Sequence, residues 1–113
     1  MEHIKKQAIE AKEASLRLGT MSTGDKNNAL LSMAESLRSN AAYIIAENEK
    51  DIKAGEEKGM TKSLIDRLAL TKARIEDMAK GLEIIAGLTD PIGEVIHAVK
   101  RPNGLDIGKV RVP

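Results

Sequence analysis

The chain has 113 residues and a formal net charge of +1, with no Cys, Phe or Trp and a single Tyr. This length suits one domain, and an apolar content of 42% is too high for a disordered tail. Because aromatic side chains each bury a large area, a core made without them from Ala, Ile, Leu and Met is expected to be thin. We therefore expect the helices to complete their burial against another body.

Several classes of protein are excluded by these totals. The 18 basic and 17 acidic residues form no basic face, and stacking aromatics are missing, so nucleic acid is not an expected partner. Apolar runs are too short for a membrane span, and the N-terminus lacks the continuous apolar stretch of a secretory signal. The absence of Cys excludes disulfides, thiolate metal sites and a Cys nucleophile. A cytoplasmic protein is predicted.

Residues 1–88 are predicted to form four or five helices. The first is amphipathic and ends near Leu18, and Ser22 and Thr23 are expected to cap the second. The third should run over residues 41–58, after an Asn40 cap. Residues on the apolar stripes of these helices include Ile4, Ala8, Ala11, Ala29, Leu30, Met33, Ala34, Leu37, Ile44, Ile45 and Ile52.

Two further helices follow. Gly59 is placed to stop the third helix. The segment "MTKSLIDRLAL" predicts a short helix, and Thr71 is expected to cap a fifth that ends at Gly87. Beyond "TDPIG" the apolar period changes from that of a helix to that of a strand.

The last part of the chain predicts a β-hairpin, with strands at 93–100 and 104–112. Asn103-Gly104 between two runs of β-forming residues is the pattern of a tight primed turn. The apolar residues of the second strand change faces at Gly108, which predicts a β-bulge there. Val95, His97 and Val99 are expected to share one face of the first strand.

Such a ribbon needs a partner. A lone two-stranded hairpin is marginally stable in water, and its open edges and apolar faces favour pairing. We predict homo-oligomerisation through residues 93–112. The apolar end of the second strand, at Val112, suggests that the intact protein is longer.

Polar residues with possible site chemistry are few. His3 and His97 are isolated, without metal-like spacing, and a structural or solvent-facing role is expected for both. Asn48 lies on an apolar stripe, where its amide is expected to bond a neighbouring loop backbone rather than a ligand. Asp51 is expected to serve the same corner.

The other polar patterns in the sequence do not predict a binding or catalytic site. Asp66 and Arg67 are adjacent on a helix, so ion pairing with other elements is favoured over a joint site. Glu56 and Glu57 predict a solvated helix end. The segment "STGDKNN" lacks the spacing of a phosphate loop. No His or acid is suitably placed beside Ser15, Ser22 or Ser63, so none of these three serines is expected to be a nucleophile. We therefore predict no catalytic, cofactor-binding or metal-binding residue.

Several longer segments carry a resemblance to a known family. The most specific are "DPIG" at 90–93 and "RPNGL" at 101–105, with "KNNALLSMAESL", "AENEKDI" and "LIDRLAL" before them. Over nearly its whole length the chain resembles the N-terminal part of the gamma-glutamyl phosphate reductase family, also called glutamate-5-semialdehyde dehydrogenase. That family belongs to the aldehyde dehydrogenase superfamily.

The resemblance implies a fold and an activity for the intact protein. The implied fold is α/β, and this chain is mainly α with a C-terminal β-hairpin. Residues 1–88 would be the helical start of the cofactor-binding domain and 89–113 the start of an oligomerisation arm. The implied reaction is NADPH-dependent reduction of L-glutamyl 5-phosphate to L-glutamate 5-semialdehyde, in proline biosynthesis.

The chain also departs from the family's pattern. The family's chemistry needs a Cys thiolate and a Gly-rich dinucleotide loop, and neither is present, so no catalytic or cofactor residue carries over. We expect a truncated portion that is inactive alone. Two alternatives remain open: a stand-alone helical interaction module that pairs through its hairpin, and a regulatory fragment that binds the full enzyme by strand addition.

Overall fold

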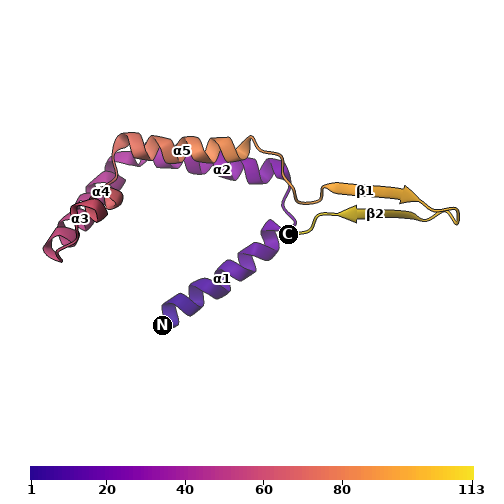
Figure 1. The fold of residues 1–113 in the computed structure, drawn as a ribbon, viewed down its shortest axis with the longest axis horizontal. Coiled ribbons are helices and arrows are strands. Elements are labelled where there is room, and N and C mark those ends of the chain that lie inside the picture. The colour runs from indigo at the N-terminus through magenta and orange to yellow at the C-terminus, as the bar shows by residue number, and fades with distance from the viewer. The chain divides into compact units, whose positions relative to one another are not determined.

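The computed structural model describes residues 1–113 as five helices followed by a two-stranded antiparallel ribbon (Figure 1). The predicted class, mainly α with a C-terminal β-hairpin, is confirmed. The elements in chain order are α1 (Glu2–Leu18), α2 (Thr23–Ser39), α3 (Ala41–Glu57), α4 (Lys62–Leu68), α5 (Lys72–Ala86), β1 (Val95–Lys100) and β2 (Asp106–Val110).

The chain divides into two compact units. Unit 1 joins Met1–Lys26 to Leu88–Pro113, and unit 2 is Asn27–Gly87. All buried residues belong to unit 2: Ala34, Asn48, Gly55, Ile75 and Ala79. The thin core expected from the missing aromatics is therefore observed, and most large apolar side chains stay at least partly exposed.

Short polar side chains cap the N-terminus of three of the helices. Ser22 Oγ accepts the Asp25 N–H at the start of α2, Thr61 Oγ1 accepts the Leu64 N–H, and Thr71 Oγ1 accepts the Arg74 N–H. These bonds satisfy backbone donors that a first helical turn leaves unpaired.

Two predicted caps act differently. Thr23 is the first residue of α2, and its hydroxyl donates to Asp90 instead of capping. Asn40 precedes α3, but its side chain makes no cap bond. Its Nδ2 donates to Ser36 O at 2.8 Å, at the end of α2. That carbonyl also accepts the Asn40 backbone N–H, so the side chain adds a second bond to the end of α2.

Gly59 ends α3 as predicted. Its φ is +76°, in the left-handed region. The Gly59 N–H donates to Glu56 O and the Met60 N–H donates to Gly55 O, which is the bond pattern of a Schellman motif. The turn brings Met60 and Ile65 close to Gly55: a Cβ there would lie 2.6 Å from Met60 Sδ and 3.1 Å from Ile65 Cδ1. Gly55 thus permits the close approach of the chain beyond α3.

The ribbon turn differs from the primed turn that was predicted. No residue other than glycine has a positive φ, so within this turn Asn103 is not left-handed and Gly104, at +88°, is. Gly104 N donates to Arg101 O, and Arg101 N donates to Leu105 O. This is a three-residue loop of type I form followed by a left-handed Gly. Pro102 explains the choice, because its fixed φ suits the first central position of such a turn.

The β-bulge also lies elsewhere than predicted. The register is regular through Gly108, which pairs with Ala98, and it shifts between Val95 and His97. The extra residue is therefore Ile96, on β1. Consequently Val95 and His97 oppose Val110 and Lys109, which lie on opposite faces of β2, so Val95 does not share a face with His97 and Val99.

Candidate functional site

The two faces of the ribbon are set by the bulge at Ile96. One face carries the cross-strand pairs Val95–Val110, Ala98–Gly108 and Lys100–Asp106. Because Ala98 and Gly108 are small, this face is concave between the larger pairs. We call the surface formed by Val95, Ala98, Gly108 and Val110 the ribbon hollow.

The ribbon hollow is open and apolar. Val95 is 59% exposed and Val110 47% exposed, and every residue of β2 is exposed. Both strand edges are unpaired, since the sheet has two strands only. A surface of this kind offers backbone hydrogen-bonding groups along its edges and apolar contact on its face.

The root of the ribbon is anchored by Asp90. Its carboxylate accepts from Thr23 Oγ1 at 2.9 Å, from Lys26 Nζ at 2.5 Å and from the Ile92 N–H at 3.0 Å. These bonds favour the ionised carboxylate: the one from Lys26 contributes most, and together they lower the pKa of Asp90 to about 2. All four residues belong to unit 1. Asp before Pro is a turn signal in the sequence, but no local pattern predicts that Thr23 and Lys26 meet this carboxylate.

A second structural cluster joins α2 to α5. The Arg38 guanidinium donates to both carboxylate oxygens of Glu76, at 3.0 and 2.9 Å, and of Glu83, at 2.5 and 3.1 Å. Hydrogen bonds from Arg38 lower the pKa of both glutamates. The seven-residue spacing places the two acids on one face of α5. Because each of the four carboxylate oxygens accepts a bond from Arg38, we assign the cluster a structural role in unit 2.

Asn48 occupies the corner predicted for it. The side chain is buried; Nδ2 donates to Leu68 O at 3.0 Å, and Oδ1 accepts the Leu70 N–H at 2.7 Å. Asp51 does not contribute: it is exposed on α3 and makes none of these bonds. Asn48 already satisfies the corner's backbone groups, and the carboxylate at Asp51 is better hydrated in solvent.

The Asp66-Arg67 pair is also structural. Asp66 forms an exposed ion pair with Arg74 of α5, at 3.4 Å. The same guanidinium donates to the backbone carbonyls of Asp66 and Ala69. Arg67 is exposed and takes no part. The prediction of pairing with another element holds for Asp66, with Arg74 as the partner that sequence reasoning did not identify.

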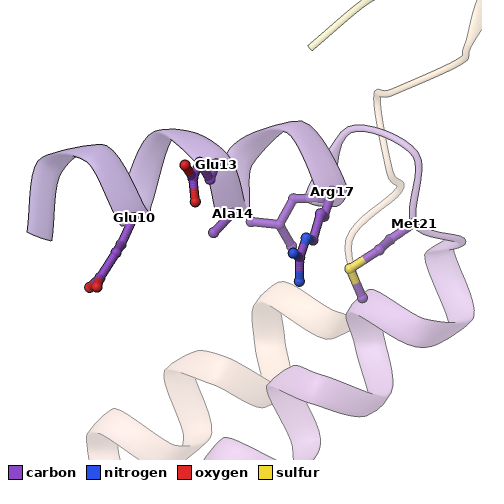
Figure 2. A pocket seen from close by; sticks show the side chains of 6 residues that line it. Glu10, Glu13, Ala14, Arg17 and Met21 are labelled. Carbon is purple, nitrogen blue, oxygen red and sulfur yellow. The ribbon is translucent and has the colours of Figure 1, made fainter. Parts of the chain in front are cut away.

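A shallow concavity lies along α1 and the turn after it. Glu10, Glu13, Arg17 and Met21 line it together with Ala14 and Leu18 (Figure 2). The charged groups do not converge on one point, and Glu10 pairs with Lys6 at 3.7 Å on the exposed surface. The arrangement has no donor–acceptor pair positioned for catalysis.

The remaining candidates lie apart from one another. His3, His97, Glu56 and Glu57 are all exposed. Ser15 Oγ donates to the Lys12 carbonyl, Ser22 caps α2, and Ser63 is exposed. No group of three or more acids and histidines is placed to hold a metal ion, and none of the helices combines the length and apolarity needed to cross a membrane.

Curated proteins similar to this chain are gamma-glutamyl phosphate reductases. The protein of Geotalea daltonii is 48% identical over 112 residues, which are 99% of this chain and 27% of the relative. That of Clostridium botulinum strain Alaska E43 is 55% identical over 103 residues, 91% of this chain and 25% of the relative. The chain thus spans about a quarter of the length of the curated relatives it matches. No family model matches it.

Solved structures give the same result. A gamma-glutamyl phosphate reductase from Thermotoga maritima matches 96% of this chain and 26% of its own, with a TM-score of 0.89 and 41% identity. One from Saccharomyces cerevisiae matches 94% of this chain and 27% of its own, with a TM-score of 0.81 and 33% identity. The matched part is their N-terminal segment. The resemblance read from the sequence motifs is confirmed.

Proposed function

We propose that this chain is the N-terminal portion of a gamma-glutamyl phosphate reductase. The observation that carries the proposal is the match to solved reductases over 94–96% of the chain at 33–41% identity. Curated reductases extend the likeness over as much as the whole chain. This coverage does not favour a stand-alone helical interaction module.

For the intact protein, the proposed reaction is reduction of L-glutamyl 5-phosphate to L-glutamate 5-semialdehyde. NADPH would supply the hydride, and inorganic phosphate would leave. Residues 1–113 contain no Cys and no Gly-rich strand–turn–helix segment, so we assign them no catalytic or cofactor-binding role. Alone, the segment is proposed to be inactive, and the intact enzyme is proposed to act in the cytoplasm.

The contribution of this segment is structural. Residues 1–88 are proposed to open the cofactor-binding domain, and 89–113 to begin the arm through which subunits associate. The exposed apolar side chains of the helices and the open edges of the ribbon support this division of roles. The intact protein is proposed to be a homo-oligomer held in part by residues 93–112.

A chimera tests the enzymatic proposal. Residues 1–113 replace the matching segment of the Geotalea daltonii reductase, and the chimera is expressed in a bacterium that needs proline because it lacks this enzyme. We expect growth without proline, and NADPH oxidation with L-glutamyl 5-phosphate by the purified chimera. The segment alone should support neither. A folded chimera without activity would contradict the proposal.

Association is tested on the chain itself by sedimentation velocity across the micromolar range. We expect self-association that is lost on deleting residues 93–113 and weakened by Val110→Lys with Val112→Lys, since edge lysines block strand pairing. Ile4→Lys with Ile9→Lys, on exposed positions of α1, is the matched control. Monomers for every variant and for the parent chain would contradict ribbon-mediated association.

A further inference from the structure

The junction at Asp90 connects the first turn of α2 to the ribbon through one carboxylate. Thr23 and Lys26 reach it from the same face of the helix, three residues apart. The Ile92 N–H closes a tight turn on the other oxygen. No other side-chain hydrogen bond or ion pair joins residues 23–26 to 88–113.

We propose that Asp90 is a positioning residue, a pin that fixes the direction in which the ribbon leaves the first turn of α2, residues 23–26. The Asp90 side chain is 16% exposed and that of Lys26 22%, so water competes for these bonds less than at a surface pair. In its consequence for subunit association the inference rests on the proposed function; in its geometry it does not.

The chain between Asp90 and the strands transmits the constraint. Pro91 has a fixed φ, and its carbonyl accepts the Glu94 N–H at 3.3 Å. The Gly93 N–H donates to Arg111 O, and Arg111 donates to Glu94 through both its backbone N–H and its Nε, each at 3.0 Å. Pairing therefore begins at the third residue after Asp90, with no free linker between.

A small rotation at the pin becomes a large displacement at the far end. At roughly 3.3 Å per residue, the eight or so residues from Glu94 to Arg101 span about 26 Å. A tilt of about 10° at the root then moves the turn by about 4–5 Å. Such a shift exceeds what two complementary surfaces tolerate, so an unpinned ribbon would meet a partner in the correct pose less often.

The test measures ribbon direction without relying on activity. The chain has no native Cys, so spin labels can be placed at Gly24→Cys, on the first turn of α2, and Arg101→Cys, beside the ribbon turn. Pulsed electron paramagnetic resonance then gives the distribution of distances between the two spin labels. We expect Asp90→Ala and Lys26→Met each to widen this distribution at least twofold, and Lys26→Arg to leave it unchanged.

Two further measurements separate positioning from general stability. Glu47→Gln, which removes the exposed Glu47–Lys50 pair in α3, is the matched control and should not widen the distribution. Circular dichroism should show unchanged helix content in each variant. If Asp90→Ala does not fold, Lys26→Met gives the result. An unchanged distance distribution in a folded Asp90→Ala or Lys26→Met variant would overturn the proposal.

Association is then measured on the same variants by sedimentation. We expect Asp90→Ala and Lys26→Met each to associate at least fivefold more weakly than the parent chain. A widened distribution with unchanged association supports the pin and contradicts only its consequence for subunit association. An unchanged distribution with normal ribbon-dependent association contradicts the pin alone.

Discussion

Asn48 shows how one polar side chain can fix a turn between helices. It is buried, and it uses both ends of its amide on the backbone at Leu68 and Leu70, where α4 ends. Asn48→Leu would leave a part-buried carbonyl and N–H unpaired, at a cost of about 1–3 kcal/mol in the free energy of unfolding. Urea denaturation followed by circular dichroism measures this loss.

The control for this prediction is Asn28→Leu, an exposed position on α2. Its effect should stay within about 0.5 kcal/mol, as for most surface substitutions. An equal effect at both positions would show that the buried bonds at Asn48 contribute little to stability.

Substitution of Gly59 and of Gly81 by Ala should change the stability of the fold in opposite directions. At Gly59 the positive φ of +76° disfavours a Cβ, so Gly59→Ala is expected to destabilise by roughly 1–2 kcal/mol. Gly81 lies inside α5 with open space around its Cβ position, and Gly81→Ala is expected to stabilise by about 0.5–1 kcal/mol. Thermal unfolding of both variants makes the comparison; a stabilising Gly59→Ala would contradict the role of the left-handed turn.

The lowered pKa of Asp90 predicts that the free energy of unfolding falls in acid. Its pKa is about 2 in the fold and ordinarily 3.8, so the folded state holds the proton less tightly than the unfolded chain. The stabilisation is therefore fully present above about pH 4 and is lost as the pH falls toward about 2. Carboxyl-carbon NMR should give the low pKa directly. Asp90→Asn should flatten the change of unfolding free energy with pH in this window; an identical slope would contradict the prediction.

At the scale of elements, Arg38 holds α2 against α5 through two carboxylates. A Lys cannot reproduce this arrangement, because its ammonium lacks the planar fork that engages both acids. Arg38→Lys is expected to lower the urea midpoint and to move the pKa of Glu76 and Glu83 back toward the ordinary value.

The measurement is carboxyl-carbon NMR titration of Glu76 and Glu83 together with urea denaturation. Lys50→Gln, in an exposed pair on α3, is the control and should change neither quantity appreciably. Unchanged titration of both glutamates in Arg38→Lys would show that the guanidinium geometry is unimportant.

At the scale of the whole molecule, buried residues are confined to one of the two units. Unit 2 contains every fully buried side chain, whereas α1 and β2 contain none. Backbone amides in α3 and α5 are therefore expected to exchange with solvent hydrogen roughly tenfold or more slowly than those in α1. Exchange measured by NMR tests this, and equal protection of α1 would contradict it.

The sequence by itself determined the helices, their approximate ends and the presence of a ribbon. These follow from local causes: apolar periodicity, Gly59 at a helix end, Thr71 as a cap and the change of period after "TDPIG". The motifs at 90–93 and 101–105 also determined the family resemblance that the comparisons confirm. The burial of Asn48 was accessible too, because an amide on an apolar stripe must find partners.

Only the tertiary structure decided which distant residues meet. Asp90 and Lys26 are separated by 64 positions, and Arg38 meets Glu76 and Glu83 through a helix pairing that no local pattern encodes. The bulge at Ile96 and the loop at Pro102 were likewise decided by strand register, which depends on both strands together. Local preference fixes what each segment becomes, while long-range contacts select one arrangement among several that the same local preferences permit.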